Sequence, residues 1–314
     1  MNLPTRRLAS RLSLPVLAMA SVVANAGITV TGAAVRVTGS GLGCPEWPKC
    51  TADSYVPVAH PEISPVMMGV EFGNRLVTFL VLAVGFACVV KAWSSRGSRP
   101  DLLWLALIQP AGITAQALWG GVVVKTMLNP FTVGMHFILS IGLTAGCWLL
   151  YTRSRQGTGP ARLLVHPAIA KLTAGLVAAV LGLLVAGVAV TGTGPHSGDE
   201  LASRFDLDIE IVARIHADLA YLVVGLTFAV VFALYVSRAP RPVLRAALAL
   251  LAIELLQGAI GYTQYFLGVP AFLVGLHVLG ATLVWIFTLR LVSATRTRDA
   301  VEPVPSPTLA ATSA

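Results

Sequence analysis

Three histidines lie inside long apolar stretches of this chain, where an ionisable side chain is costly and therefore indicates a function. They are His136, His216 and His277, and each follows the start of an apolar run by about five to seven residues. At 1.5 Å per helical residue, each would lie roughly 8–10 Å below the same edge of a set of helices. Glu71 and Asn74 open another run slightly nearer that edge, three residues apart on one helix face. The five residues are predicted to form one polar layer.

The elements that must position this layer are membrane helices. Of the 314 residues, 56% are hydrophobic and only 11% are charged, whereas soluble domains have about 25% charged residues. Runs of this length and polarity form helices in lipid, so the fold class is an all-α integral membrane protein. Eight runs are close to the ~20 residues that a spanning helix needs: 14–35, 69–90, 102–124, 131–151, 168–191, 209–236, 244–266 and 270–292.

Charge alternates between the segments that connect these runs. Arginines and lysines gather at both termini and in every second connection, whereas segments 37–68 and 193–208 hold few basic residues and several acids. The positive-inside rule predicts a multi-pass protein of the plasma membrane with both termini in the cytoplasm and these two segments outside. Residues 5–26 resemble a signal peptide, but the apolar stretch continues beyond them, so we expect it to remain as the first span.

An internal repeat relates the polar residues in pairs. The segment AQALWGGVVVKTMLNPFTVGMHFILSIG aligns with LLQGAIGYTQYFLGVPAFLVGLHVLGAT. Gln116 precedes His136 by 20 residues, and Gln257 precedes His277 by 20. We expect both glutamines to donate hydrogen bonds within the helix bundle.

The repeat extends upstream of these segments. FGNRLVTFLVLAVG aligns with ARIHADLAYLVVG, which places Asn74 opposite His216, and VTGSG at 37–41 resembles VTGTG at 190–194. Each half is therefore a four-helix unit with an even number of spans. Both halves must insert in the same orientation, as parallel repeats related by an axis along the membrane normal.

The matched histidines indicate a haem site. Two facing imidazoles in a four-helix bundle are a usual way to hold a haem, with the iron bound from both sides. By symmetry, His216 and His277 should face each other in the second bundle, and Asn74 and His136 in the first. The alternative for each histidine is a hydrogen bond to a neighbouring helix. His196, in the second outer segment, could approach a haem propionate, but we expect it to be solvated.

Other motifs are less specific. Glu71 could simply pair with Arg75 four residues later, and Arg75 could itself meet a haem propionate. Cys44 and Cys50 in GCPEWPKC lie on the side where disulfides persist, and a zinc site there would lack two ligands. HExxH, P-loop and Rossmann patterns are absent. CxxCH is absent too, so no covalently attached haem is expected. The net charge of +8 forms no patch with interleaved aromatics, so no nucleic-acid partner is expected.

In combination, these features resemble the haem A synthase family, and within it a bacterial, actinobacterial-like type. Members oxidise the C8 methyl of haem O to a formyl group, which supplies haem A to terminal oxidases. The resemblance covers nearly all of 14–292, and it is carried by TGSGLGCPEWPKC at 38–50, EFGNRL at 71–76, His136, His216 and His277.

The resemblance implies a role for each half. The second half would hold a resident haem b with His216 and His277 as its metal ligands. The first half would bind the substrate haem O, with His136 on its iron, and the helix 2 glutamate, Glu71, would be catalytic. Asn74 is also assigned to the substrate site.

Further implications concern the outer edge of that site. Arg75 is assigned to substrate binding as well. The external pair Cys44 and Cys50 would lie beside the substrate as a disulfide. We expect it to hold Pro45, Trp47 and Pro48 as a lid over the haem edge, or to be reduced and re-formed.

Two departures from the family pattern matter. Typical members carry a histidine where this chain has Asn74, and asparagine is a poor iron ligand, so the first half would offer only His136. Some members also carry a cysteine pair in the second outer segment, where this chain has GTGPHSGDE. These departures predict an asymmetric pair of haem sites.

The expected partners are haem O, membrane lipid, a haem O synthase or terminal oxidase, and further copies of this chain. The rival functions are a quinol-linked dihaem b-type electron carrier, whose ligands should lie at two depths, and a parallel-repeat transporter, which needs no histidine pair.

The domain boundaries follow from the repeat. The predicted segments are a cytoplasmic N-terminus (1–13), a substrate bundle (14–152), a cytoplasmic linker (153–167), a haem b bundle (168–292) and a disordered cytoplasmic tail (293–314).

Overall fold

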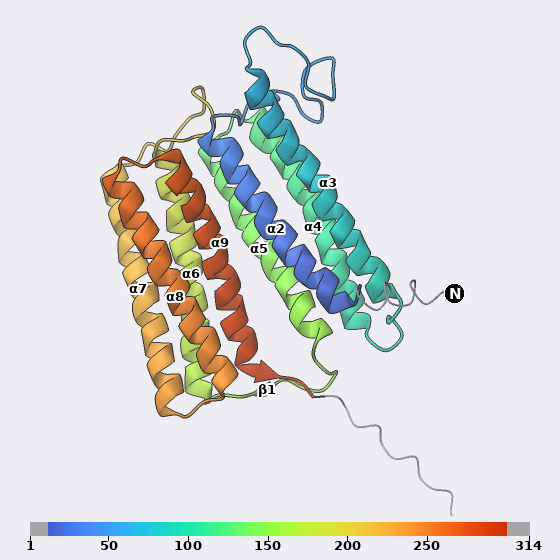
Figure 1. The fold of residues 1–314 in the computed structure, drawn as a ribbon, viewed down its shortest axis with the longest axis vertical. Coiled ribbons are helices and arrows are strands. Elements are labelled where there is room, and N and C mark those ends of the chain that lie inside the picture. The colour runs from blue at the N-terminus through green and yellow to red at the C-terminus, as the bar shows by residue number, and fades with distance from the viewer. Residues whose placement is uncertain (1–11, 300–314) are drawn as a thin grey trace, which may run out of the picture.

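The computed structural model describes residues 12–299, and in that part of the chain the fold is almost entirely helical (Figure 1). Eight helices are long and apolar enough to cross a membrane, which confirms the all-α prediction. Their bounds are α2 Leu14–Val37, α3 Pro65–Trp93, α4 Pro100–Lys125, α5 Pro130–Ser154, α6 Pro167–Thr193, α7 Ile209–Val236, α8 Arg241–Phe266 and α9 Ala271–Ala294.

Proline and polar caps determine where the helices begin. Proline is the first residue of α3, α4, α5 and α6, a position where its missing N–H costs no hydrogen bond. The side chains of Ser64, Asn129 and Asp208 accept hydrogen bonds from N–H groups in the first turns of α3, α5 and α7. These local signals explain why the helices start within a few residues of the apolar runs.

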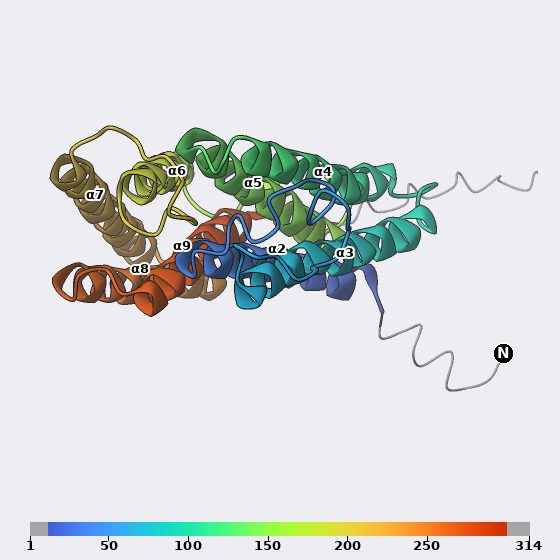
Figure 2. The ribbon, with the colours of Figure 1, turned by 90° about the horizontal axis from the view of Figure 1, so that it is seen from above.

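The eight helices form two four-helix units in the order that the internal repeat predicts. Helices α2–α5 form the first half and α6–α9 the second (Figure 1). The halves meet where α2 and α5 pack against α6 and α9. Seen from above, α3 and α4 lie toward one edge of the molecule and α7 and α8 toward the other (Figure 2). Connections 38–64 and 194–208 lie at the same end, which we call the loop end (Figure 1).

Two short strands lie at the opposite end. Strand β1 (Arg162–Leu163) pairs with β2 (Arg296–Thr297) in an antiparallel ladder. The expectation of disorder from residue 293 is therefore wrong for 293–299, because α9 continues to Ala294 and β2 follows it. The N-terminal residues 1–11 and the tail 300–314 lie outside the described part of the chain.

Hydrogen bonds join the two halves within their apolar contact. Trp285 of α9 is almost fully buried, and its indole N–H donates to the carbonyl of Ile141 in α5 at 2.9 Å. Trp148 of α5 donates in the reverse direction to the Ser293 hydroxyl at 2.9 Å. Each half thus contributes one tryptophan whose indole N–H bonds to the other half.

The halves are also joined at the loop end. Arg36, in the last turn of α2, donates to the carbonyls of Thr191 and His196 in the second half. The imidazole Nε2 of His196 lies 2.9 Å from the carbonyl oxygen of Val269. The expectation that His196 is solvated is therefore wrong, because its side chain and backbone link two connections and α2.

Trp285 should contribute measurably to the contact between the halves. We expect Trp285→Phe to lower stability by about 1 kcal/mol, the usual value of one buried hydrogen bond, and so to lower the thermal unfolding midpoint of the purified protein. Trp104→Phe is the matched control, because Trp104 is 71% exposed on α4. Equal midpoints for the two variants would contradict the role of Trp285.

Candidate functional site

The second half brings two histidines together between helices. His216 extends from α7 and His277 from α9, and their ring centres are 6.3 Å apart with the planes inclined at 63°. Both side chains are half-buried, and the Nδ1 atom of each is buried without a hydrogen-bond partner among the described residues. Nδ1 of His136 in the first half is in the same state, and the Nδ1 atoms of His216 and His277 lie toward Gly187 and Gly261 of the neighbouring helices.

The spacing of the rings suits a shared metal ion. An imidazole nitrogen lies about 1 Å from its ring centre and binds a metal at about 2 Å, so two rings that share one ion have centres about 6 Å apart. In residues 12–299, no group of three or more His, Cys, Asp or Glu side chains could hold a metal ion. Two protein ligands are sufficient only if another molecule supplies the rest, as a tetrapyrrole does. The residues present therefore fit a haem.

Small and polar residues of neighbouring helices support these rings. A Cβ atom placed on Gly187 of α6 would lie 3.2 Å from Cε1 of His216, and one on Gly261 of α8 would lie 3.1 Å from Cε1 of His277. The Gln257 side chain donates to the His277 carbonyl at 2.7 Å. Glycine thus lets α6 and α8 approach the rings, and Gln257 fixes α8 against α9.

The first half repeats this arrangement around one histidine. Gln116 of α4 donates to the His136 carbonyl at 3.1 Å, which confirms that both repeat-matched glutamines bond within their bundles. Gly120 faces His136, since its Cβ position would be 3.6 Å from Cε1 of that ring. Asn74 of α3 accepts a hydrogen bond from the Thr31 hydroxyl of α2 at 2.7 Å. That Asn74 faces His136 stays a prediction.

Glu71 is buried at the loop end of α3, and both of its oxygens are engaged. Oε2 accepts the backbone N–H of Cys44 at 2.6 Å. Oε1 accepts two N–H groups of Arg75, from Nε at 3.1 Å and from Nη2 at 2.5 Å. The i, i+4 pair expected from the sequence is therefore present. Three donors thus fix the position of this carboxyl group at the edge of the first half.

Arg75 connects this carboxylate to the cysteine loop, residues 44–50. Besides Glu71, it donates to the carbonyls of Cys44 at 2.8 Å, Glu46 at 3.0 Å and Lys49 at 3.0 Å. All five N–H groups of the guanidinium are thus used. To bind a haem propionate as well, Arg75 would have to release one of these acceptors.

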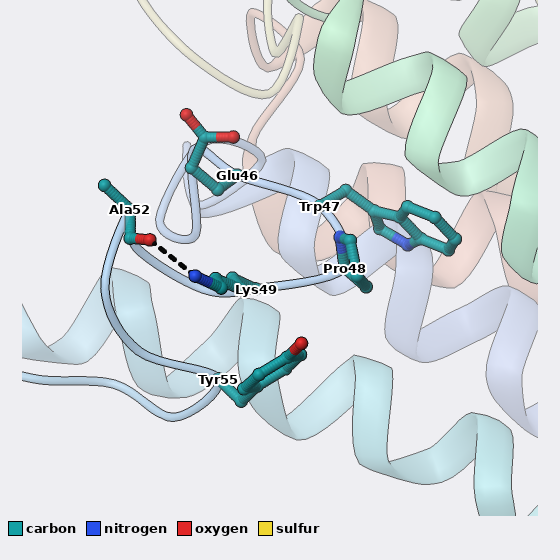
Figure 3. Close-up of a pocket in the computed structure, with 6 residues that line it drawn as sticks. All are labelled: Glu46, Trp47, Pro48, Lys49, Ala52 and Tyr55. Carbon is teal, nitrogen blue, oxygen red and sulfur yellow. Dashed lines mark hydrogen bonds between the residues drawn. The ribbon is translucent and has the colours of Figure 1, made fainter.

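The cysteine loop is closed by a disulfide. Cys44 and Cys50 are bonded and completely buried. Glu46, Lys49 and Tyr55 line a shallow hollow on the loop, and the Lys49 ammonium donates to the Ala52 carbonyl (Figure 3). Trp47 points away from these side chains toward the helices (Figure 3).

Sequence reasoning placed Trp47 in a lid over the haem edge but missed the residue that Trp47 contacts. A Cβ atom on Gly121 of α4 would lie 2.6–3.0 Å from three ring atoms of Trp47. Only a glycine allows the indole to rest on α4 at this point. The aligned repeats carried a signal for this contact, because the second half has Tyr262 where the first has Gly121.

Each half also contains buried polar side chains whose hydrogen bonds were not predicted from the sequence. In the first half, Ser21 donates to Gln109, and the Asn25 amide donates to Cys147 Sγ at 3.3 Å. In the second half, Thr227 donates to Glu254 at 2.9 Å. The first contact links α2 to α4 across the bundle, and the others link the neighbouring pairs α2 and α5, and α7 and α8, as polar side chains in membrane bundles commonly do.

Comparison with known proteins gives a consistent result. The sequence model of the family COX15-CtaA, described as cytochrome oxidase assembly protein, matches residues 15–289. The chain is similar to the haem A synthase of Lysinibacillus sphaericus, with 34% identity over 42% of each protein. It is also similar to those of Geobacillus kaustophilus (31% identity over 45% of this chain and 43% of that protein) and Staphylococcus epidermidis (30% over 36% of each). The matched segments thus span less than half the length of these relatives.

Arg75 should be necessary for holding the cysteine loop in place. Arg75→Lys keeps the charge but cannot reach four acceptors at once. Losing bonds to a charged donor, each worth about 1.5–3 kcal/mol, should raise amide hydrogen exchange in residues 44–55 by at least about tenfold.

The control is Arg96→Lys, since Arg96 donates only to the Trp93 carbonyl at the far end of α3. An unchanged exchange rate in Arg75→Lys would contradict the role of Arg75.

Proposed function

Because the chain belongs to the COX15-CtaA family of cytochrome oxidase assembly proteins, we propose that it is a haem A synthase. In this proposal it oxidises the C8 methyl of haem O to a formyl group within the membrane and so supplies haem A to terminal oxidases. The observation that carries the proposal is the histidine pair of the second half, His216 and His277, with ring centres 6.3 Å apart. The first half has one histidine, His136, at the matching place, and a buried carboxyl group, Glu71, at its loop end.

The two halves divide the work. The second half, 168–292, would hold a resident haem b through His216 and His277. When bound, this haem supplies electron transfer. The protein's contribution is to fix both rings through the tight packing of Gly187 and Gly261 and the hydrogen bond from Gln257. The second half offers two histidines to its haem, whereas the first half offers only His136. This difference explains why one haem stays while the other is converted.

The first half, 14–152, binds haem O as substrate. Haem O enters laterally from the membrane, and His136 is the axial ligand of its iron. Asn74 lies on the other side of the haem and is too weak a ligand to hold the iron from that side. One strong ligand suits a substrate that must leave as product.

The chemistry takes place at the loop end of the first half. The methyl carbon gives up four electrons in two oxidations and gains two hydroxyl groups, with the electron acceptor and the oxygen source both supplied from outside the chain. The resulting gem-diol loses water to give the aldehyde. Glu71 is held as an anion by Cys44 and Arg75, so it can stabilise positive charge that develops at the methyl carbon, or take up a proton there. Arg75 acts on the substrate through the loop that it holds.

The protein is a multi-pass membrane protein, and we propose its orientation from charge. Arginines gather in the connections at the end opposite the loop end. They indicate that this arginine-rich end, with both termini and the linker 153–167, faces the cytoplasm. The loop end would then face the oxidising side, in agreement with the Cys44–Cys50 disulfide. A haem O synthase and a terminal oxidase are the partners that this chemistry requires, and homo-oligomers remain compatible with it.

Co-expression with a haem O synthase, followed by extraction and identification of the haems, tests the function. We expect haems B, O and A from the wild-type protein. Glu71→Ala should retain haem B but make at least about 100-fold less haem A, the usual loss when an electrostatic catalyst is removed. Glu71→Gln keeps the size of the side chain and removes only its charge.

Normal haem A in Glu71→Ala would contradict the catalytic role of Glu71. Haem B alone from the wild-type protein would favour the electron carrier, and no haem at all would favour a transporter.

The ligand assignment has its own prediction. His277→Ala should abolish the low-spin b-type absorption spectrum of the purified protein, because the iron would lose one of its two imidazoles. His60→Ala is the control, since His60 lies in the connection 38–64 and only accepts the Glu62 backbone N–H. A low-spin spectrum that survives in His277→Ala would refute the assignment.

A further inference from the structure

The two halves differ at one pair of matched positions. In the second half, Tyr221 lies five residues after His216, and Tyr262 lies five residues after Gln257. In the first half, the residues five positions after Asn74 and Gln116 are Phe79 and Gly121. The same place on the outer helices α3 and α4 therefore carries one aromatic side chain where α7 and α8 carry two.

In the second half, these side chains close the edge of the bundle. The hydroxyl groups of Tyr221 and Tyr262 are hydrogen-bonded to each other across α7 and α8. They lie little more than one helical turn from the level of His216 and Gln257. This closure belongs to the helices themselves, so it can open only if the helices separate or both side chains turn away.

In the first half, a residue from outside the helices fills the corresponding place. Gly121 has no side chain to meet Phe79, and the Trp47 indole occupies the space where a side chain of Gly121 would begin. Gly121 is buried as a result. Its neighbour Gly120 is the residue that faces His136. Trp47 therefore covers the first half beside the proposed substrate ligand.

Trp47 is held in position through its loop. The Cys44–Cys50 disulfide closes the loop, and Glu71 and Arg75 bind its backbone from α3. The loop reaches α4 through Trp47, whereas the hydrogen bonds that hold it come from Glu71 and Arg75 of α3. The closure of the first half thus comes from a segment outside the helices, whereas that of the second half comes from two of the helices.

We propose that Trp47 is a removable side wall of the substrate haem site, and that the Tyr221–Tyr262 pair is the fixed wall of the resident haem site. This inference rests on the proposed function and adds a positioning residue to it. Trp47 controls how fast haem O enters and haem A leaves between α3 and α4. The tyrosine pair keeps haem b from leaving through the gap between α7 and α8.

A haem-transfer experiment tests this inference without measuring catalysis. The protein is purified after co-expression with a haem O synthase and mixed with an excess of apomyoglobin as haem acceptor. The haems that remain on the protein are extracted at intervals and separated by type. Trp47→Ala should speed the release of haems O and A by about tenfold, equivalent to about 1.4 kcal/mol of barrier, and leave the release of haem B unchanged.

Matched variants separate the wall from general damage to the loop. Tyr55→Ala removes another aromatic ring of the same connection that lies away from α4 (Figure 3), so it should behave as wild type. Trp47→Phe should restore slow release. Gly121→Ala leaves the loop sequence intact but places a Cβ where the indole lies, so it should act like Trp47→Ala. Tyr262→Ala should show the opposite pattern, with faster release of haem B alone.

Three results would overturn the inference: unchanged release from both Trp47→Ala and Gly121→Ala, release of all haems together in those variants, or no effect of Tyr262→Ala on haem B. Absence of haems O and A from the wild-type protein would instead overturn the proposed function, and this inference with it.

Discussion

A polar group between membrane helices has no water to bind, so it must find its partner within the chain. Many polar groups meet this constraint with at least one partner: Gln116 and Gln257 donate to backbone carbonyls, Glu254 accepts from Thr227, and Glu71 accepts from a backbone N–H and an arginine. Some atoms in the described residues still lack a partner, among them Nδ1 of His136, His216 and His277. His216 and His277 differ from the other polar residues because their two rings meet between helices, 6.3 Å apart.

The two four-helix units are similar in sequence, and they differ at a few matched positions. His216 in the second half corresponds to Asn74 in the first, and in the proposed function this difference sets how tightly each half holds iron. Tyr262 corresponds to Gly121, which leaves room for Trp47. The cysteine loop lies in the first half alone.

Sequence reasoning was successful where the signal is periodic or repeated. The eight helices follow from run lengths, and the facing of His216 and His277 follows from the repeat, because helical geometry converts spacing directly into position. It failed for His196, the start of the tail and Trp47. Each of these depends on a contact between segments distant in the chain, such as Arg36 with His196 or Trp47 with Gly121. Their spacing in sequence carries no information on which segment comes near.

The pairing of β1 with β2 has a consequence for the order in which the chain is completed. It joins the connection between the halves to residues that follow the last helix, so it can form only after all eight helices have been synthesised. Contacts between residues so far apart are slow to form because a long loop must close first. The strand pair therefore forms late in biogenesis, after both halves have entered the membrane. It then joins the end of the second half, after α9, to the connection that precedes α6.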